Sequence, residues 1–275
     1  PIFKARRIRT LHARSFSDDP TRLFRAVRFE TRLGFRMDRE TAAQFAEAGR
    51  QHLPERLSGH RLLNELRLML SDAHPEKQMA RLHVMRLLRF VHPKLVWTSA
   101  QARLFAAVRT AVDRDHHEGR AKGVERWRVL FMALVADLSA RALDDMLKRL
   151  AVPTREAEQA RTVHGRAATI LRSLARRPAP KPSAIYRLLS GLADETICFL
   201  IARASTEAVR KRLLAYAGSY RKVAPILTGA DLKALGLKPG PAYKKTLARL
   251  LEARLDGAVR SKADELKLAA RLARA

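Results

Sequence analysis

SFSDDPTRLFRAVRFETRLGF, residues 15–35, carries the clearest helix signals of this chain. Pro20 suits the first turn of a helix, Asp19 suits the N-cap, and Gly34 suits the position just past the last turn. On a helix of this span, an arc of about 120° holds all the arginines that follow Pro20, and other faces hold the large apolar residues. The arginines are Arg22, Arg25, Arg28 and Arg32, and the apolar residues are Leu23, Phe24, Val27 and Leu33. The stretch therefore predicts a helix with an arginine stripe and a mostly buried remainder.

This arginine stripe has two explanations. Like charges at i, i+3 spacing repel, and a triphosphate or an RNA backbone would compensate them, because guanidinium groups match phosphate oxygens. A solvated basic face is the alternative, and spacing alone favours it. The whole chain is basic, however, with 55 Lys and Arg against 27 Asp and Glu and a net charge of +28. Such a charge indicates a polyanionic partner, most commonly nucleic acid.

Asp19 and Arg22 stand three residues apart at the start of the predicted helix and can point the same way. A carboxylate accepts hydrogen bonds and a guanidinium donates them. Cytosine and adenine both present an amino donor beside a ring-nitrogen acceptor, whereas uracil and guanine present a carbonyl in place of the amino group. The pair can therefore accept C and A and reject U and G. The alternative is that Asp19 only caps the helix, and without further information this simpler explanation is favoured.

The rest of the chain predicts an all-α fold. Leucines recur at helical spacing in several stretches, and alternating β-branched runs typical of strands are nearly absent. The segment 177–183 is rich in proline and has the composition of a linker. We expect an elongated array of helices in three parts, residues 1–74, 75–176 and 177–275.

Composition also narrows the class of protein. Cys198 is the only cysteine, which excludes intrachain disulfides and cysteine zinc sites and fits the cytoplasm. The longest apolar run, residues 129–138, is far too short to span a membrane. A membrane-surface protein would need a basic amphipathic helix with large aromatic residues, which the chain lacks, so we expect no membrane partner.

The chain resembles the class II tRNA nucleotidyltransferases (CCA-adding enzymes) and bacterial poly(A) polymerases. The resemblance begins with RIRTLHARSFSDDPTRLFRAVRFETRLGF, residues 7–35, which looks like the family's nucleotide-reading motif. It continues with LSGHRLLNELRLML at 57–70, MARLHVMRLLRFVHPKL at 79–95 and a tail block at 226–257. These blocks span most of the chain. The resemblance implies that the three predicted parts are the family's neck, body and tail.

The resemblance implies roles for single residues in the neck. Asp19 and Arg22 would read the base edge of CTP or ATP, and Arg25 and Arg28 would complete the nucleotide pocket. Asp18 matches the other acid of the family's acidic pair. In the second block, relatives often have an acid where this chain has His60. Arg61 and Glu65 stand four positions apart in the same block, and we interpret them as a helix-stabilising pair at i, i+4.

A departure from the family concerns the catalytic head, which carries a Gly-Gly-x-x-Arg-Asp loop and an Asp-x-Asp pair for two metal ions. The chain has no Gly-Gly pair, and its one Asp-x-Asp match, residues 113–115, follows no strand or glycine loop. The chain begins at Pro1, not Met, and we expect a piece of a longer enzyme. The intact enzyme would use Mg²⁺ with ATP or CTP, and its substrate would be tRNA. We expect the chain alone to be inactive and to bind no cofactor.

Other readings of the sequence remain. A poly(A) polymerase would share the same neck, and a stand-alone helical RNA-binding protein would share the basic charge. A metal site at His116, His117 and Glu118 is a weaker candidate, because adjacent helical histidines point apart and no further ligand follows. The His-Asp dipeptide of a phosphohydrolase module is missing.

The tail segment LGLKPGPAYKKTL, residues 235–247, places glycines before a predicted helix. A helix start exposes backbone N–H groups that can hold a phosphate, and Lys238, Lys244 and Lys245 would add positive charge. The segment loosely resembles a helix-hairpin-helix turn that grips an RNA backbone. An ordinary corner between two helices, with glycines in left-handed conformations, explains it equally well.

Overall fold

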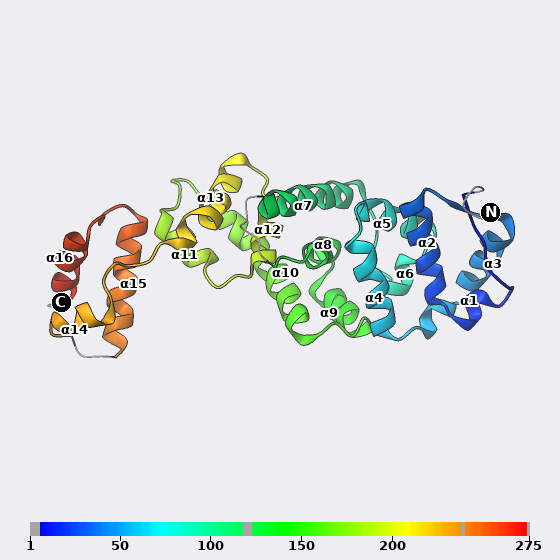
Figure 1. Ribbon diagram of the computed structural model, residues 1–275, viewed down its shortest axis with the longest axis horizontal. Helices are drawn as coiled ribbons and strands as arrows, with labels where there is room; N and C mark the ends of the chain where they lie inside the picture. The colour runs from blue at the N-terminus through cyan, green and yellow to red at the C-terminus, as the bar shows by residue number, and fades with distance from the viewer. Residues whose placement is uncertain (1–5, 118–122, 238–239, 274–275) are drawn as a thin grey trace. The chain divides into compact units, whose positions relative to one another are not determined.

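The computed structural model describes residues 6–117, 123–237 and 240–273, and it is helical nearly throughout (Figure 1). About 71% of the structure is helix and 2% is strand, which confirms the all-α prediction. The chain divides into two compact units. The first unit contains Pro1–Ala167 and Asp194–Arg203, and the second contains Ala168–Ala193 and Ala204–Ala275. The division into parts at 74 and 176 remains a prediction.

Most helices of the first unit follow one another along the chain, and the last one, residues 194–203, returns to this unit after part of the second. They are α1 (Ser15–Asp18), α2 (Thr21–Leu33), α3 (Arg39–Arg50), the short 3₁₀ helix η1 (Leu53–Arg56), α4 (Gly59–Leu70), α5 (Pro75–Val84), α6 (Leu88–Val91), α7 (Ser99–His117), α8 (Arg126–Val135), α9 (Ala140–Arg149) and α12 (Asp194–Arg203). The long helix α10 (Thr154–Ala175) starts in this unit and ends in the second.

Two short strands in the first unit were not predicted. β1 (Arg7–Ile8) and β2 (Arg36–Met37) pair in parallel, with Arg7 opposite Arg36. The Asp38 N–H donates to the Ile8 carbonyl at 3.1 Å. Two residues are too few to show an alternating pattern, so the sequence carried no signal for them. The pairing holds the chain before α1 against the connection between α2 and α3.

The core around α2 is built from leucines and aromatic residues at helical spacing. Leu23, Phe24 and Val27 of α2 are buried, and α2 packs against α4 and α5 (Figure 1). Leu62 and Leu66 of α4 and Met79 and Leu82 of α5 are also buried. Leu33 was expected on a packed face of α2 but is 46% exposed, because α2 ends at this residue. Burial of apolar area of this kind is the main stabilising term in the unit.

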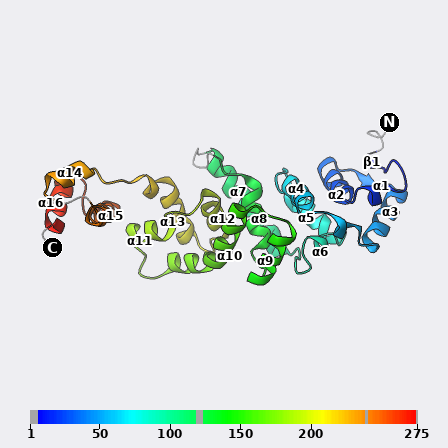
Figure 2. The same cartoon turned by 90° about the horizontal axis from the view of Figure 1, so that it is seen from below.

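A second packed region of the same unit is centred on α8. Figure 2 shows α7, α8 and α12 grouped together, and they contact one another. Every residue of α8 from Val129 to Val135 is buried, as expected for a helix that is apolar all round. Cys198 of α12 is buried and donates a hydrogen bond to Asp115 of α7 at 3.1 Å. Burial raises the pKa of the Cys198 thiol well above its ordinary value, and the hydrogen bond from the thiol to Asp115 adds to the shift.

Polar side chains anchor the loops of the second unit. Its helices are α11 (Pro182–Leu189), α13 (Glu207–Gly218), α14 (Gly229–Ala234), α15 (Pro241–Leu255) and α16 (Lys262–Ala273), with the 3₁₀ helix η2 (Tyr220–Lys222). Glu265 of α16 is fully buried and accepts hydrogen bonds from the Ile226 and Leu227 N–H groups and from Arg254. Asp256 accepts hydrogen bonds from the backbone and side chain of Ser183 at 2.9 and 2.8 Å. Residues 177–181 of the predicted linker lie in the loop between α10 and α11, whereas residues 182–183 form the start of α11.

The apolar core around α15 is small, and consists of Leu227, Leu232, Leu250 and Ala269. In the described part of the chain, no helix has the length and apolar character needed to cross a membrane.

Candidate functional site

Asp19 lies at the junction of α1 and α2, and its carboxylate is held from two directions. Its Oδ1 accepts hydrogen bonds from the Thr21 N–H at 3.0 Å and the Thr21 hydroxyl at 2.6 Å, as a capping residue does. The same oxygen accepts a hydrogen bond from Arg61 Nη2 of α4 at 2.8 Å. No described residue donates to Oδ2. The local fold therefore fixes one carboxylate oxygen and leaves the other as an acceptor.

The ionised form of Asp19 is the stable one at neutral pH. Partial burial alone would raise the pKa of Asp19, but the hydrogen bonds from Thr21 and the charges of Arg61 and Arg22 outweigh it. The pKa therefore lies below its ordinary value. An ionised carboxylate can only accept hydrogen bonds.

Arg22 and Arg25 of the predicted stripe line one cavity. The cavity has a volume of about 460 Å³, is open to solvent and is lined by residues of the segment 8–11, α1, α2 and α3, but not by Asp19. Arg22 Nη1 donates to the Ser15 carbonyl at 3.2 Å, which directs the guanidinium toward α1 while its other N–H groups remain available. Phe16 and Phe29 add apolar surface to the lining. A site of this kind, with aromatic rings beside cationic donors, suits a nucleotide.

The wall formed by residues 8–11 is attached to α3. The Thr10 N–H donates to Thr41 Oγ1 at 3.0 Å, and the Thr10 hydroxyl donates to Gln44 at 2.8 Å. Arg9 Nε donates to Asp38 at 2.8 Å. These contacts join residues about thirty positions apart, so helical periodicity could not reveal them.

Arg61 and Glu65, predicted as an i, i+4 pair, each make their direct ion-pair contact with another residue, although the charge of Arg61 also acts to lower the pKa of Glu65. Arg61 reaches across to Asp19, and Glu65 lies 3.7 Å from Arg28 Nε of α2. Burial raises the pKa of Glu65 above its ordinary value, although the charges of Arg28 and Arg25 oppose the shift. Arg61 therefore faces the start of α2 and Glu65 faces the arginine stripe, because α4 packs against α2.

Glu30 is a part of the site that sequence reasoning missed. Its side chain is 1% exposed, and it accepts hydrogen bonds from Arg81 Nε of α5 and the Met37 N–H, at 2.8 and 2.9 Å. A buried acid on the apolar face of α2, four residues before Gly34, was the available signal. Glu30 fixes the C-terminal end of α2 against α5 and β2.

Asp18 lies apart from this arrangement. It is exposed and lies near His12 and Arg14, at 3.8 and 3.6 Å. Of the adjacent acids, only Asp19 is held at the start of α2.

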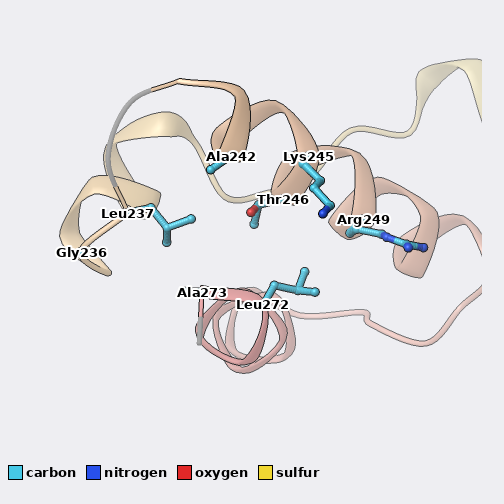
Figure 3. A pocket seen from close by; sticks show the side chains of 8 residues that line it. All are labelled: Gly236, Leu237, Ala242, Lys245, Thr246, Arg249, Leu272 and Ala273. Carbon is cyan, nitrogen blue, oxygen red and sulfur yellow. The ribbon is translucent and has the colours of Figure 1, made fainter. Parts of the chain in front are cut away.

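The tail lysines occupy different positions around α15. A cavity of about 580 Å³ lies between α15 and α16 and the turn before α15, and Lys245, Thr246 and Arg249 line it opposite Leu272 (Figure 3). Lys244 is exposed and does not line it. Lys238 lies outside the described residues. Of the three lysines predicted to bind RNA, Lys245 is the one that the structure shows at this cavity.

The described residues do not fit a metal site. No group of three or more His, Cys, Asp and Glu side chains in this part of the chain could hold a metal ion. Asp113 pairs with Arg126 at 2.5 Å, whereas Asp115 is buried beside Cys198, so the two acids face different partners. His117 is exposed at the end of α7, and Glu118 lies outside the described residues.

Comparison with curated proteins finds similarity to tRNA nucleotidyltransferases, of which this chain spans only a part. It is 37% identical over 270 residues to the A-adding tRNA nucleotidyltransferase of Geobacter sulfurreducens, covering 97% of this chain and 31% of that protein. It is 27% identical to the A-adding tRNA nucleotidyltransferase of Halalkalibacterium halodurans, covering 95% of this chain and 58% of that protein. No protein-family model matches the chain.

Solved structures agree with these relatives. The Thermotoga maritima CCA-adding enzyme complexed with tRNA matches with a TM-score of 0.78 and 25% identity, over 97% of this chain and 64% of that one. Structures of a CCA-adding enzyme with CTP and with ATP each match with a TM-score of 0.77, at 26% and 27% identity, over 96% of this chain and 62% and 63% of theirs. Nearly the whole of this chain is therefore homologous to a segment of the tRNA nucleotidyltransferases.

Proposed function

We propose that this chain is the RNA-binding and nucleotide-selecting part of a tRNA nucleotidyltransferase that adds A, C or both to tRNA 3′ ends. The observation that carries the proposal is the Asp19 carboxylate, ionised and fixed at Oδ1, next to Arg22 in a homologue of A-adding enzymes. In the whole enzyme, CTP or ATP would be the nucleotide and tRNA the acceptor. The cytoplasm is the compartment that we propose for it.

The choice of base follows from the Asp19 acceptor and the Arg22 donors that make no hydrogen bond to any described residue. Asp19 Oδ2 accepts the exocyclic amino group of cytosine or adenine, and Arg22 donates to the adjacent ring nitrogen. Uracil or guanine would place a carbonyl against the carboxylate, which leaves two acceptors facing each other and costs binding energy. Arg25 would hold the nucleotide from the same cavity, and Arg28 would support it from the next turn of α2.

Arg61 is a positioning residue in this proposal. Its hydrogen bond to Asp19 Oδ1 keeps the carboxylate from rotating, so that Oδ2 is presented in one orientation. Glu65 lies 3.7 Å from Arg28 Nε without a hydrogen bond, and it would position Arg28 through its charge alone.

Chemistry of phosphoryl transfer is not assigned to this chain. We propose that Mg²⁺ and its carboxylate ligands belong to a catalytic head outside this segment, and that residues 1–74, 75–176 and 177–275 act as neck, body and tail. The isolated chain is then expected to bind tRNA without extending it. Incorporation of labelled CTP or ATP into a tRNA that ends at the discriminator base, with Mg²⁺ present, would contradict this.

The test of nucleotide selection uses an intact enzyme that contains this segment. Asp19→Ala should reduce the preference for CTP and ATP over UTP and GTP by about tenfold or more, because the rejected bases lose their mismatch. Asp19→Asn retains an oxygen that can cap α2 but exchanges one acceptor for a donor, and it should also lose the preference.

Asp18→Ala is the matched control, since it removes an adjacent acid that is not held at α2. It should change the preference less than twofold. Full selectivity in Asp19→Asn would show that Asp19 acts only as a helix cap. Equal extension of tRNA and an unrelated RNA primer with ATP alone would favour the poly(A) polymerase alternative.

A further inference from the structure

A second cavity lies further along the arginine stripe, where α2, α4 and α5 meet. Its volume is about 500 Å³, and its lining includes Arg28, Arg32, Ser71, His74 and Gln78. Arg22 and Arg25 line the first cavity but not this one. The stripe therefore serves two separate spaces: of the arginines proposed to hold the nucleotide, Arg22 and Arg25 line the first cavity and Arg28 lines the second.

The second cavity contains a buried acceptor that the protein leaves unused. Gln78 is 1% exposed, and no described residue donates to its side-chain Oε1. A buried polar atom without a partner destabilises a protein, because it has lost its hydrogen bonds to water. Since Gln78 lines the cavity, a ligand with a hydroxyl or amino donor can supply the missing bond.

Positive charge and a helix start lie at the same cavity. Arg32 is exposed, and within the described ranges no carboxylate pairs with it. The cavity also adjoins the start of α5, a helix of ten residues whose N-terminus no described side chain caps. The N-terminus of a helix attracts anions, and arginine matches phosphate oxygens.

The turn before α5 is held in place from outside the cavity. Arg109 of α7 donates to the Ala73 carbonyl at 3.1 Å and to Glu76 at 3.0 Å. Asp72, the acid in the lining, accepts from the Ala73 N–H within the same turn. The start of α5 is thus preformed, which lowers the cost of ordering it around a ligand.

We infer that this cavity binds one ribonucleotide unit through its sugar and phosphate. The phosphate would lie against Arg32 and the start of α5, and the ribose 2′-hydroxyl would donate to Gln78 Oε1. A 2′-hydroxyl distinguishes RNA from DNA and is present whatever the base. The inference builds on the proposed RNA-binding function and adds a site that reads the sugar, not the base.

The experiment measures binding of the full chain to a single-stranded RNA hexamer and to the DNA hexamer of the same sequence, with ATP and dATP as separate arms. The wild type should prefer RNA about fivefold, the value of one hydrogen bond. Gln78→Leu should remove the preference and leave DNA binding within twofold. Arg32→Gln should weaken RNA and DNA alike and lower the salt slope by about 0.7, as expected for one phosphate contact on a single strand.

Two controls separate binding from folding and from general charge. Gln78→Leu should melt no lower than the wild type, because it replaces an unpartnered buried acceptor with an apolar side chain. Arg103→Gln removes an exposed arginine on α7 that lines neither α2 cavity, and it should leave the preference for RNA unchanged.

The outcomes distinguish the ligand sources and the two proposals. Loss of the preference in the hexamer arm of Gln78→Leu assigns the site to an RNA strand, and loss in the ATP arm assigns it to a free ribonucleotide. A wild type that binds tRNA but has no preference, or a Gln78→Leu variant that retains it, overturns the ribose site and leaves the proposed function standing. A chain that binds neither tRNA nor either hexamer overturns both.

Discussion

Asp38 shows how a single carboxylate can stabilise two elements. It caps α3 through the Thr41 N–H at 2.8 Å and also accepts from Arg9 of the segment before α1. The hydrogen bond from the Thr41 backbone and those from the side chains of Thr41 and Arg9 lower the pKa of Asp38 to about 2. Because the folded pKa lies below the ordinary value, the stabilisation is complete above about pH 4 and is lost as the pH falls through about 2.

Removal of this carboxylate should have a cost that depends on pH. Asp38→Ala should lower the free energy of unfolding by about 1 kcal/mol at pH 7, the usual value of an N-cap. The difference from the wild type should shrink as the pH falls from 4 toward 2, as measured by urea unfolding. Ser139→Ala removes a neutral cap from α9 and should show a cost that does not change with pH. A constant cost for both variants would contradict the assigned pKa.

Residues of the candidate site were only partly predictable from the sequence. Asp19 as a helix cap and Gly34 as a terminator depend on neighbours in the chain. Asp19 accepts from the first N–H of α2, although the N-cap position is taken by Pro20, one residue later than predicted. Gly34 ends the helix with a φ of 67°, as predicted. The contact of Arg61 with Asp19 joins residues 42 positions apart, and that of Arg81 with Glu30 joins residues 51 apart. Such contacts depend on how helices pack, which the spacing of residues within one helix does not determine.

At the scale of elements, the approach of α4 to the turn between α9 and α10 depends on one glycine. A Cβ atom at Gly59 would meet the backbone carbonyl of Arg149 and would lie 2.7 Å from the Leu150 carbonyl carbon. Arg149 also donates to the Leu57 carbonyl at 3.1 Å, which holds the same junction from the other side. The start of α4, and with it Arg61, is therefore positioned by a backbone-to-backbone contact.

Gly59→Ala should therefore destabilise the protein by roughly 1–3 kcal/mol, because the displaced atoms belong to the backbone. Gly165→Ala is the matched control in the interior of α10, where a Cβ would meet nothing within 4 Å. It should stabilise the helix by up to about 1 kcal/mol. Urea unfolding followed by circular dichroism measures both, and a neutral Gly59→Ala would contradict the close approach.

The helices were easier to predict from the sequence than the short strands and the contacts between helices. The helix that follows Pro20 and ends at Gly34 was visible, and so was the apolar stretch that became α8. The strands β1 and β2 were missed because two residues cannot show a period. The cavities were also invisible, because each one is lined by residues from several elements.

At the scale of the whole molecule, the net charge of +28 should make tRNA binding strongly dependent on salt. Replacing Lys244 and Lys245 with glutamine should lower the slope of log affinity against log salt by about one for each RNA phosphate that these lysines neutralise. Lys211 and Lys222, exposed in the same unit, provide a double substitution of equal charge change. Equal slopes for the two double variants would show that α15 makes no specific contact.

The function of the whole molecule was accessible only through resemblance. Charge indicated a polyanion, and the Asp19–Arg22 spacing allowed base reading, but each had a simpler explanation. The long motif around DDPTR favoured the functional explanation over the simpler one, because it specifies residue types that helix formation does not require.

Cys198 gives the protein a practical property. Maleimide dyes react with thiolates, and the one native thiol is buried, with a pKa raised far above neutral. Cysteines introduced at exposed positions such as 103 and 211, one in each unit, would therefore accept a fluorescent donor and acceptor without removal of Cys198. Energy transfer between the dyes would then follow the separation of the two units as tRNA is added, in a protein whose native sequence is otherwise unchanged.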